Sequence, residues 1–596
     1  MKYAEIALNI PIDKTFHYSI PPATSPCVEI GKRAWVTFGK RRMVGYIVGL
    51  SETSPVSSIK PLEGIIDDVP VLDGEQMKFT KWMSEYYCTS WGSTLDAAIP
   101  WPLKKGRTSI RERGGATAEE HFSKSSALPP TDEQQRALKE IKGAVEKSAF
   151  EVFLLHGVTS SGKTEVYLQC ISDIIEKDKS AIVLIPEISL TPQTVERFKS
   201  RFGDAVAIAH SQMKGSSRFK EWKRLRDGLA KVAVGPRSAL FSPVRNLGLI
   251  VVDEEHDTSY KQGDTPRYHA REASVERARQ AGCPVILGSA TPSMESYFLA
   301  KKGEYRLLEL TRRIDDRPLP QSVVIDMKKE MAKGKRSFVI STYLRKRIDE
   351  TLKADRQTML FLNRRGFSTY IFCKQCGYTE KCKKCDTVMV YHSSKRQLVC
   401  HYCNWKKEKP NICPTCHSTY LSYSGKGTEK IESEIHRNFP YGKIERMDSD
   451  VTRRRGAHKA ILKNIKEGKT NILIGTQMIA KGHDFPQVTL VGVISADVSL
   501  NLPDFRSGER TFNLLTQVAG RAGRGKDAGE IVIQTYAPAH YAIQAAAKQD
   551  YIAFYNRELE LRRDLNFPPF THIIEITLKA VKDDIAQGAA RELVEY

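Results

Sequence analysis

Two glycines, a lysine and a threonine stand at the spacing of a phosphate-binding loop in the stretch GVTSSGKT at 157–164. The apolar run at 152–155 predicts a buried strand before it, and a glycine loop between a strand and a helix directs backbone N–H groups at a phosphate. Lys163 is predicted to contact the β- and γ-phosphates of a nucleotide, and the Thr164 hydroxyl to bind Mg²⁺. The nucleotide-binding candidates are Gly157, Gly162, Lys163 and Thr164 and, for the adenine edge, Gln134. For Gln134 alone, an ordinary surface position is the alternative.

A pair of carboxylates follows a second apolar run, at 249–252. Asp253 is expected to hold Mg²⁺ through water, and Glu254 to orient and deprotonate the attacking water. The alternative interpretation is an acidic triplet on a solvated helix. The strand residues directly before the pair favour the catalytic interpretation, and together with the phosphate loop they predict hydrolysis of ATP.

Basic residues in QVAGRAGR at 517–524 are candidates for stabilising charge on the transferred phosphate. Arg521 and Arg524 stand at positions i and i+3, on one side of a helix turn, and are predicted to reach across a cleft as arginine fingers. Gln517 in the same stretch is a further catalytic candidate. Surface arginines that contact no phosphate are the alternative.

Eight of the twelve cysteines form four C-x-x-C pairs in one short region. They are Cys373, Cys376, Cys382, Cys385, Cys400, Cys403, Cys413 and Cys416. Eight thiolates in this arrangement predict two tetrahedral zinc sites with four cysteines each, and closed sites of this kind are structural. Disulfides would require an oxidising compartment, and an iron–sulfur cluster usually has another spacing. Several pairings of the four C-x-x-C pairs remain open.

The strands that must position these residues alternate with amphipathic helices, which is the pattern of a parallel sheet with βαβ connections. Apolar runs predict one set of strands at 152–155, 181–185, 249–252 and 285–287, and a second set at 359–362, 472–474, 488–491 and 531–533. Polar clusters follow the strands of the first set, at the carboxyl ends where such sheets bind ligands.

The N-terminal stretch to about residue 105 predicts a separate β-rich unit, with strand-like segments at 33–39 and 44–48. Lys40, Arg41 and Arg42 form a basic loop tip between the two segments. Basic and aromatic residues together suit single-stranded nucleic acid, through attraction to the backbone and stacking on bases. A solvated hairpin tip in a small barrel is the alternative.

Composition narrows the class of protein. The 596 residues carry a formal net charge of +22, which favours a polyanionic partner such as nucleic acid over a generally basic surface. The chain contains no run of 18 apolar residues, so no membrane span is predicted, and its N-terminus lacks a signal-peptide core. Clustered, reduced cysteines favour a cytoplasmic location.

Eight motifs occur in the order found in superfamily 2 helicases. They are GVTSSGKT (157–164), LIPEISLTPQ (184–193), GPRSALFSP (235–243), DEEH (253–256), GSATPS (288–293), FLNRRGFS (361–368), GTQMIAKGHDFP (475–486) and QVAGRAGR (517–524). The segments SYKQ and RYHARE after DEEH, the cysteine insertion after NRRGFS, and PDFRSGERTFNLLTQVAGRAGR at 503–524 narrow the resemblance. Over most of its length the chain resembles the bacterial replication-restart helicases of the primosomal protein N′ (PriA) family.

The resemblance implies an ATP-dependent helicase that moves 3′ to 5′ on DNA, recognises stalled or abandoned replication forks and initiates primosome assembly. It implies single-stranded and forked DNA, primosome and replicative-helicase loading proteins and single-stranded DNA-binding protein as partners. It places the protein in the bacterial cytoplasm, associated with the nucleoid and with no membrane. It also implies that the loop at 260–271 couples DNA contact to hydrolysis, with Arg267 and Tyr268 stacking on bases.

For the metal sites, the resemblance implies that the first C-x-x-C pair joins the fourth and the second joins the third. The implied ligands are Cys373, Cys376, Cys413 and Cys416 for one zinc ion, and Cys382, Cys385, Cys400 and Cys403 for the other.

The chain departs from the family in its N-terminal pocket for the 3′ end of a nascent strand. The family has a T-F-D-Y stretch there, whereas residues 15–18 here are TFHY, so a histidine replaces the acidic residue. The DNA-binding candidates are Phe16, His17, Gly39 and Lys60 in this pocket, with Arg267 and Tyr268 in the helicase. We further expect no winged-helix domain between Gly106 and Thr131, and only a partial C-terminal domain.

The predicted fold is α/β: two RecA-like P-loop lobes with parallel sheets, a small N-terminal β-barrel-like DNA-binding domain and a two-zinc insertion. The predicted domains are a 3′-end DNA-binding domain (1–105), a linker (106–127), ATP-binding helicase lobe 1 (128–314), lobe 2 (315–367 and 425–545), the zinc insertion (368–424) and the partial C-terminal domain (546–596). A loading scaffold with a vestigial ATPase is an alternative function, and a double-strand translocase or RNA helicase is another. The intact catalytic set argues against the first, and the cysteine insertion against the second.

Overall fold

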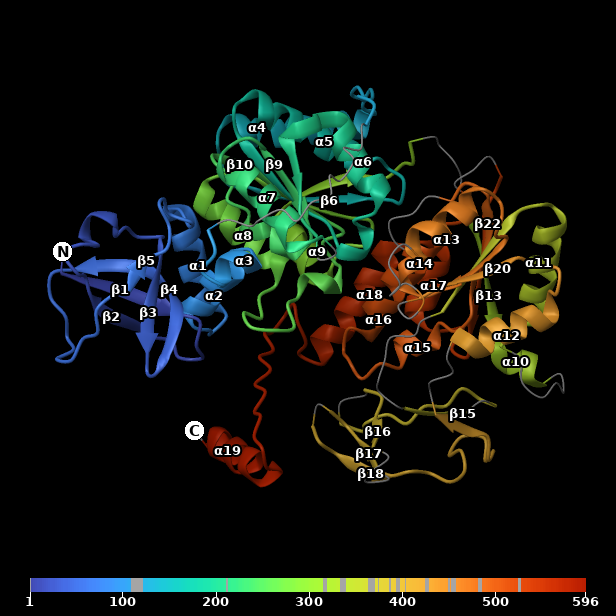
Figure 1. The fold of residues 1–596 in the computed structure, drawn as a ribbon. Helices are drawn as coiled ribbons and strands as arrows, with labels where there is room; N and C mark the ends of the chain where they lie inside the picture. The colour runs from blue at the N-terminus through green and yellow to red at the C-terminus, as the bar shows by residue number, and fades with distance from the viewer. Residues whose placement is uncertain are drawn as a thin grey trace.

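The structure is a computed structural model. It describes residues 2–108, 122–210, 213–314, 319–332, 339–362, 370–373, 375–384, 387–392, 397–401, 403–423, 428–448, 451, 457–480, 485–523 and 527–595. Figure 1 shows the N-terminal sheet beside the first helicase lobe, the second lobe on the opposite side, and the zinc insertion below the second lobe.

Lobe 1 is built on a seven-stranded parallel sheet in the order β12-β6-β11-β10-β7-β9-β8. Its strands are β6 (Val152–Gly157), β7 (Ser180–Leu184), β8 (Val206–Ile208), β9 (Val232–Gly235), β10 (Leu247–Asp253), β11 (Val285–Ser289) and β12 (Arg306–Leu310). Its helices are α4 (Asp132–Glu146), α5 (Lys163–Glu176), α6 (Pro192–Phe202), α7 (Gly215–Arg226), α8 (Ala270–Ala281) and α9 (Met294–Lys301). The four strands predicted for this lobe are confirmed as β6, β7, β10 and β11. Their residues are buried because helices cover both faces of a parallel sheet.

The turn from β6 into α5 depends on Gly162, which has φ +82° at the residue before the helix. An added Cβ at this position would lie 2.2 Å from Gln134 Nε2. Only glycine combines this backbone conformation with so close an approach, so Gly162 places Lys163 at the first position of α5.

Lobe 2 repeats the architecture with a six-stranded parallel sheet in the order β13-β23-β22-β14-β21-β20. Its strands are β13 (Gln321–Asp326), β14 (Gln357–Phe361), β20 (Ile444–Met447), β21 (Ile472–Gly475), β22 (Val488–Val493) and β23 (Glu530–Thr535). Its helices are α10 (Met327–Ala332), α11 (Thr342–Lys353), α12 (Thr428–Asn438), α13 (Ala457–Lys466), α14 (Gln477–Ala480), α15 (Asp497–Leu500) and α16 (Ser507–Ala519). The four predicted strands are confirmed, and β13 and β20 add the two edges.

The N-terminal unit begins with an antiparallel sheet in the order β2-β1-β4-β3-β5. Its strands are β1 (Tyr3–Leu8), β2 (Thr15–Ser19), β3 (Arg33–Phe38), β4 (Arg41–Ser51) and β5 (Gly64–Ile65). Hydrogen bonds from Ser19 N to Lys60 O and from Leu62 N to Ser19 O bring β2 to the segment before β5, which makes the sheet barrel-like.

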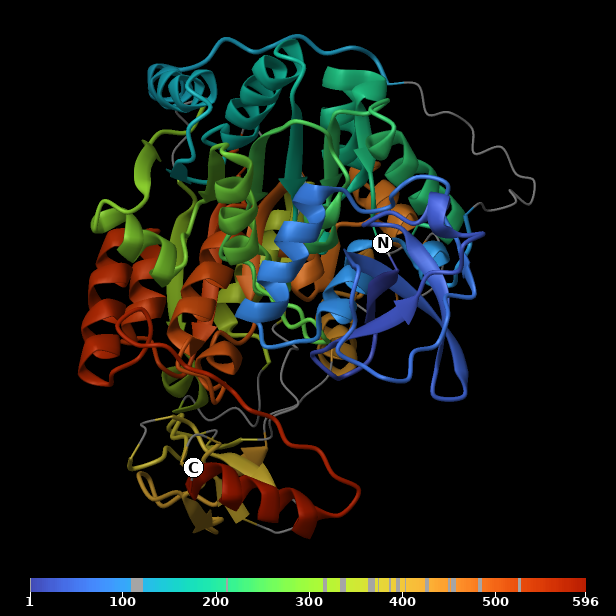
Figure 2. The same cartoon turned by 90° about the vertical axis from the view of Figure 1, so that its left-hand side faces the viewer.

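The prediction of a separate β-rich unit is wrong for the second part of this unit. It forms three helices, α1 (Gly74–Tyr86), α2 (Trp91–Ala98) and α3 (Trp101–Lys104), and they lie between the sheet and lobe 1 (Figure 1). In α1, Gln76 closes a capping box with Asp73, and its Nε2 donates to Phe241 O of lobe 1 at 3.1 Å. Figure 2, turned by 90°, shows the same helices against lobe 1.

The insertion consists of short strands in two small sheets, β15-β19 and β16-β17-β18. The strands are β15 (Ile371–Cys373), β16 (Val390–His392), β17 (Gln397–Val399), β18 (Lys406–Glu408) and β19 (Leu421–Tyr423). The insertion contacts lobe 2 through the rings of Phe372 and Tyr536, whose centroids are 6.0 Å apart. Gly377, at φ +76°, packs closely on Tyr536.

The C-terminal helices α17 (Tyr541–Lys548) and α18 (Tyr551–Asp564) pack against α16. The predicted domain boundary after residue 545 therefore falls inside α17, and both helices belong to the helicase body. The last helix, α19 (Asp583–Glu595), stands apart from the lobes at the end of an extended segment (Figure 1). None of the described helices has the length and apolar character that crossing a membrane requires.

Candidate active site

The phosphate loop lies at the carboxyl end of β6, and its lysine points back onto the loop. Lys163 Nζ donates to Gly157 O at 2.6 Å and to Val158 O at 3.4 Å. Burial lowers the pKa of Lys163, while the neighbouring carboxylates of Glu254 and Asp253 oppose that shift. A bound phosphate would give this desolvated ammonium a charged partner in place of carbonyl groups.

The two predicted catalytic carboxylates follow β10, one strand away from β6 across β11. Tyr167 OH donates to Asp253 Oδ1 at 3.2 Å, and Tyr260 OH donates to the Asp253 carbonyl at 2.6 Å. Burial, and secondly the charge of Glu254, raise the pKa of Asp253. A cation beside Asp253 would offset this desolvation, so the carboxylate suits a Mg²⁺ site. Glu254 has φ +48°, an uncommon conformation for a residue other than glycine.

Both lobes line one cavity of about 640 Å³ around the phosphate loop. Several of its buried side-chain atoms have no hydrogen-bond partner within the described part of the chain, among them Ser161 Oγ, Thr291 Oγ1 and Thr516 Oγ1. Glu254 Oε2 also lacks a hydrogen bond there, although it lies 3.6 Å from His256 Nδ1. An unpaired buried polar group costs ~1–3 kcal/mol, so these atoms fit a cavity that receives a polar ligand. Lys163, Thr164 and Asp253 would hold the phosphates and Mg²⁺ of ATP there.

Lobe 2 meets the carboxylate pair through a histidine that our sequence analysis did not single out. Gln517 Nε2 lies 2.8 Å from His256 Nε2, and His256 Nδ1 lies 2.7 Å from Ser289 Oγ. Both contacts are satisfied when Nε2 accepts from the glutamine and Nδ1 donates to the serine. The sequence signal that could have found it is the histidine of DEEH, two residues after the predicted catalytic glutamate. It links Gln517 directly to the segment that carries Glu254.

Of the two predicted arginines, Arg521 follows the end of α16. Arg521 lines the cavity together with Gln517. Gly520 stands directly over the phosphate loop, where an added Cβ would lie 2.9 Å from Thr159 Cγ2. Arg524 is outside the described residues. The structure therefore brings Lys163, Asp253, Glu254, Gln517 and Arg521 to one cavity, while their catalytic roles stay predictions.

Gln134 is buried and already bonded to the phosphate loop. Its Oε1 accepts from Thr131 N at 2.9 Å, and its Nε2 donates to Ser161 O at 2.9 Å. In this structure the amide supports the loop from behind, and contact with an adenine stays a prediction.

The end of the predicted linker forms part of the wall of the nucleotide cavity, which the sequence did not suggest. Ser125 and Ser126 line the cavity, and Ser125 N donates to Ser200 O at 3.0 Å. Arg201 holds this wall against α5, because its Nη1 donates to Ser126 O while its Nη2 lies 2.6 Å from Glu165 Oε1. The end of the linker is thus part of the nucleotide site.

The structure overturns one of the two DNA-binding predictions made for the loop at 260–271. Tyr268 is 3% exposed, and its ring packs edge-on against Phe241 with centroids 5.4 Å apart. A ring in the core cannot stack on a base, so the stacking expected of Tyr268 is wrong for this conformation. Arg267 is exposed, and its contact with DNA stays a prediction.

The cysteines of the insertion gather as two groups. Cys373, Cys376, Cys413 and Cys416 place their sulfur atoms within 4.8 Å of one another, and Cys382, Cys400 and Cys403 do the same. Pairs of Sγ atoms lie 3.5–3.6 Å apart, near the about 3.8 Å that tetrahedral Zn–S bonds of ~2.3 Å require. The pairing of the first C-x-x-C pair with the fourth is confirmed. The pairing of the second C-x-x-C pair with the third is confirmed for Cys382, Cys400 and Cys403. Cys385 lies outside the described residues.

In the N-terminal unit, Phe16 and His17 lie on opposite faces of β2. Phe16 packs edge-on against Phe38 at a centroid distance of 4.9 Å. His17 Nε2 lies 3.8 Å from Glu5 Oε1, opposite it in the β1–β2 pair. A carboxylate is therefore present beside the histidine, although the sequence places it on another strand.

The other two pocket candidates contact each other, since Lys60 Nζ donates to Gly39 O at 2.8 Å. The structure thus brings Gly39 and Lys60 together, and their contact with DNA stays a prediction.

Comparisons with known proteins agree with this geometry. The family model for the PriA 3′ DNA-binding domain matches residues 5–100, that for DEAD/DEAH box helicases matches 131–298, and that for the PriA DNA helicase Cys-rich region matches 382–407. Replication restart protein PriA of Bacillus subtilis is 36% identical over 99% of this chain and 90% of its own. That of Haemophilus influenzae is 34% identical over 100% of this chain and 90% of its own.

Among solved structures, RecG bound to a three-way DNA junction aligns with 73% of this chain and 50% of its own, at 17% identity and a TM-score of 0.42. The near full-length identity to the two replication restart proteins, with the family's DNA-binding and cysteine-rich domains in place, shows that the chain belongs to the PriA family of ATP-dependent DNA helicases.

Proposed function

We propose that the protein moves 3′ to 5′ along single-stranded DNA by hydrolysing ATP, recognises stalled or abandoned replication forks, and initiates primosome assembly for replication restart. The contact between Gln517 and His256 carries the proposal. Because lobe 2 reaches the histidine two residues from Glu254, a change at the nucleotide can alter the distance between the lobes. Cyclic closure of two DNA-binding lobes is how a nucleotide drives translocation.

The residues have distinct roles in this proposal. Lys163 holds the β- and γ-phosphates, and Thr164 and Asp253 hold Mg²⁺, which neutralises charge that develops on the phosphate oxygens. Glu254 takes the proton of the attacking water. Arg521 and Arg524 approach the γ-phosphate from lobe 2 and stabilise the transferring group.

Partners beyond DNA belong to the proposal as well. We assign primosome and replicative-helicase loading proteins and single-stranded DNA-binding protein as partners, in the bacterial cytoplasm at nucleoid-associated forks. The zinc insertion is the proposed docking element, because closed Cys₄ sites supply rigid surface and no open position for chemistry.

Strand displacement from tailed duplexes tests the direction of movement. Two duplexes of equal sequence carry either a 3′ or a 5′ single-stranded tail. We expect ATP-dependent displacement from the 3′-tailed duplex and from forks, and none without ATP. Displacement from the 5′-tailed duplex alone would contradict the direction, and fork binding without displacement would favour a loading scaffold.

Compared with the acidic residue that the family has at this position, His17 is expected to weaken the preference for a free 3′-hydroxyl at a fork. A carboxylate accepts a hydrogen bond from that hydroxyl, whereas a neutral imidazole accepts through one nitrogen and a charged one through none. His17→Asp should raise the preference for 3′-hydroxyl over 3′-phosphate ends by about fivefold, the equivalent of ~1 kcal/mol. Fluorescence titration with the two fork types measures it. A strong hydroxyl preference in the wild type that His17→Ala removes would show that histidine replaces the carboxylate.

A further inference from the structure

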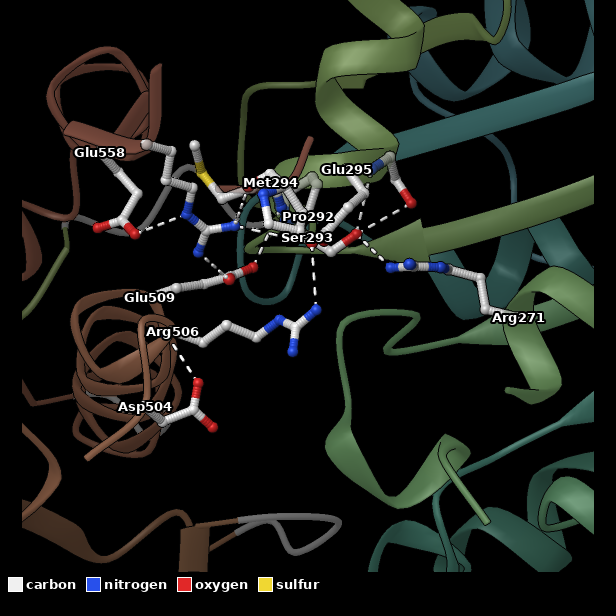
Figure 3. Close-up of polar contacts among 12 residues, drawn as sticks. Arg271, Pro292, Ser293, Met294, Glu295, Asp504, Arg506, Glu509 and Glu558 are labelled. Carbon is white, nitrogen blue, oxygen red and sulfur yellow. Dashed lines mark hydrogen bonds and ion pairs between the residues drawn. The ribbon is translucent and has the colours of Figure 1, made fainter. Parts of the chain in front are cut away.

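A cluster of buried charges joins α18 to lobe 2. Arg562 on α18 is 2% exposed, and its Nη2 lies 2.7 Å from Glu509 Oε2 on α16. Its Nε donates to Glu558 Oε1 at 2.8 Å. Figure 3 shows that the side chains of Glu509 and Glu558 come from different helices and point toward the same place. Since buried ions are stable only when paired, this arrangement fixes α16 relative to α18.

The same cluster reaches lobe 1 at the segment 292–295. Glu509 Oε1 accepts from Met294 N at 3.1 Å (Figure 3). Arg562 Nη1 lies 3.7 Å from Glu295 Oε1. Tyr551 OH, also on α18, donates to Pro292 O at 3.0 Å. A helix that follows both lobes in the chain thus contacts one segment of lobe 1 and the first turn of a lobe 2 helix.

Glu255 holds this segment from the other side. It is 0% exposed and directly follows the predicted catalytic base. It accepts from Ser293 N at 2.6 Å and from Ser296 Oγ at 2.9 Å, and it pairs with Arg271 Nη1 at 3.1 Å. The segment 292–296 therefore lies between the strand end that carries Glu254 and the Arg562 cluster.

Helix α16 is anchored at both ends. Glu509 stands in its first turn, and Gln517, which contacts His256, stands near its end. Eight residues of helix separate the two by about 12 Å. Because α16 is rigid, holding Glu509 in place also fixes the position of Gln517 near the end of the helix and of Arg521 beyond it.

We propose that Arg562 is a positioning residue for ATP hydrolysis. By pairing with Glu509 it holds the first turn of α16 on residues 292–295, and this contact sets where Gln517 and Arg521 stand relative to Glu254. The inference rests on the proposed ATP-driven activity and adds to it a buried residue that is not among those lining the nucleotide cavity.

The test compares Arg562→Met with Arg557→Met in the full chain. Arg557 lies on the same helix but is exposed, and its ion pair within the described residues is with the exposed Glu560, so it controls for removing an arginine from α18. In Arg562→Met we expect kcat for ATP with single-stranded DNA to fall about tenfold to a hundredfold, as misplacement of catalytic groups does. The KM for ATP should stay near the wild-type value because the phosphate loop is untouched. Arg557→Met should match the wild type in both quantities.

A second variant separates positioning from stability. Arg562→Met leaves Glu509 and Glu558 buried without their partner, which destabilises the fold, and adding Glu509→Gln and Glu558→Gln removes both unpaired charges. We expect this triple variant to regain thermal stability while its kcat stays low. Recovery of kcat together with the Tm, or wild-type kcat in Arg562→Met, would overturn the inference. A wild-type protein without DNA-stimulated ATPase would instead contradict the proposed function.

Discussion

Lys163→Ala is expected to abolish ATP hydrolysis and leave fork binding close to that of the wild type. The ammonium supplies the positive charge that stabilises the transferring phosphate, and removing such a group costs about 10²–10³-fold in kcat. The DNA-binding candidates lie on other surfaces, in the N-terminal unit and the loop before α8. Steady-state ATPase and fluorescence titration with a fork measure the two quantities.

Lys177→Ala is the matched control for this prediction. Lys177 caps the other end of α5 and is exposed, with Glu146 as its nearest carboxylate at 4.0 Å. The Lys177→Ala variant should hydrolyse ATP at the wild-type rate. Near-normal turnover in Lys163→Ala would remove the phosphate loop from the mechanism, and loss of fork binding together with ATPase would mean that the variant is misfolded.

Loss of one zinc ligand is expected to uncouple DNA unwinding from ATP hydrolysis. The purified protein should contain two zinc ions, and Cys382→Ser should contain one, because a tetrahedral site with three thiolates holds its metal less well. Metal binding supplies folding energy to such small units, so the insertion should lose structure while the lobes stay folded. We expect strand displacement and partner loading to fall further than ATPase. Metal analysis, a displacement assay and an ATPase assay on one preparation test this.

Cys88→Ser is the control, because Cys88 is exposed and lies outside the insertion. It should retain both zinc ions and both activities. A wild-type stoichiometry of zero or one zinc would contradict the eight-ligand arrangement. Equal loss of every activity in Cys382→Ser would indicate global misfolding instead of a local role.

The sequence predicted the parts of the site that depend on local chemistry. The phosphate loop, the carboxylates after β10 and the cysteine pairs each combine a residue type with a fixed spacing, and flanking apolar runs predicted the strands that hold them. Glycine at 162 belongs to the same class, since its left-handed conformation excludes other residues.

What the sequence did not predict depends on contacts between distant segments. Tyr268 lies in a polar loop and gave no sign that Phe241 would bury it. Arg562 stands in a helix rich in charged residues, a pattern typical of an exposed face, yet it is 2% exposed because carboxylates from α16 and α18 surround it. Helices α1 to α3 were missed because strand-like segments dominated the interpretation of the N-terminal unit.

The ATPase rate of the wild-type protein with three matched nucleic acids tests the central claim most directly. Single-stranded DNA, forked DNA and RNA of the same sequence and length are compared at equal nucleotide concentration. A DNA helicase of replication restart should be strongly stimulated by both DNAs and little by RNA. Equal stimulation by RNA, or no stimulation by either DNA, would contradict the account.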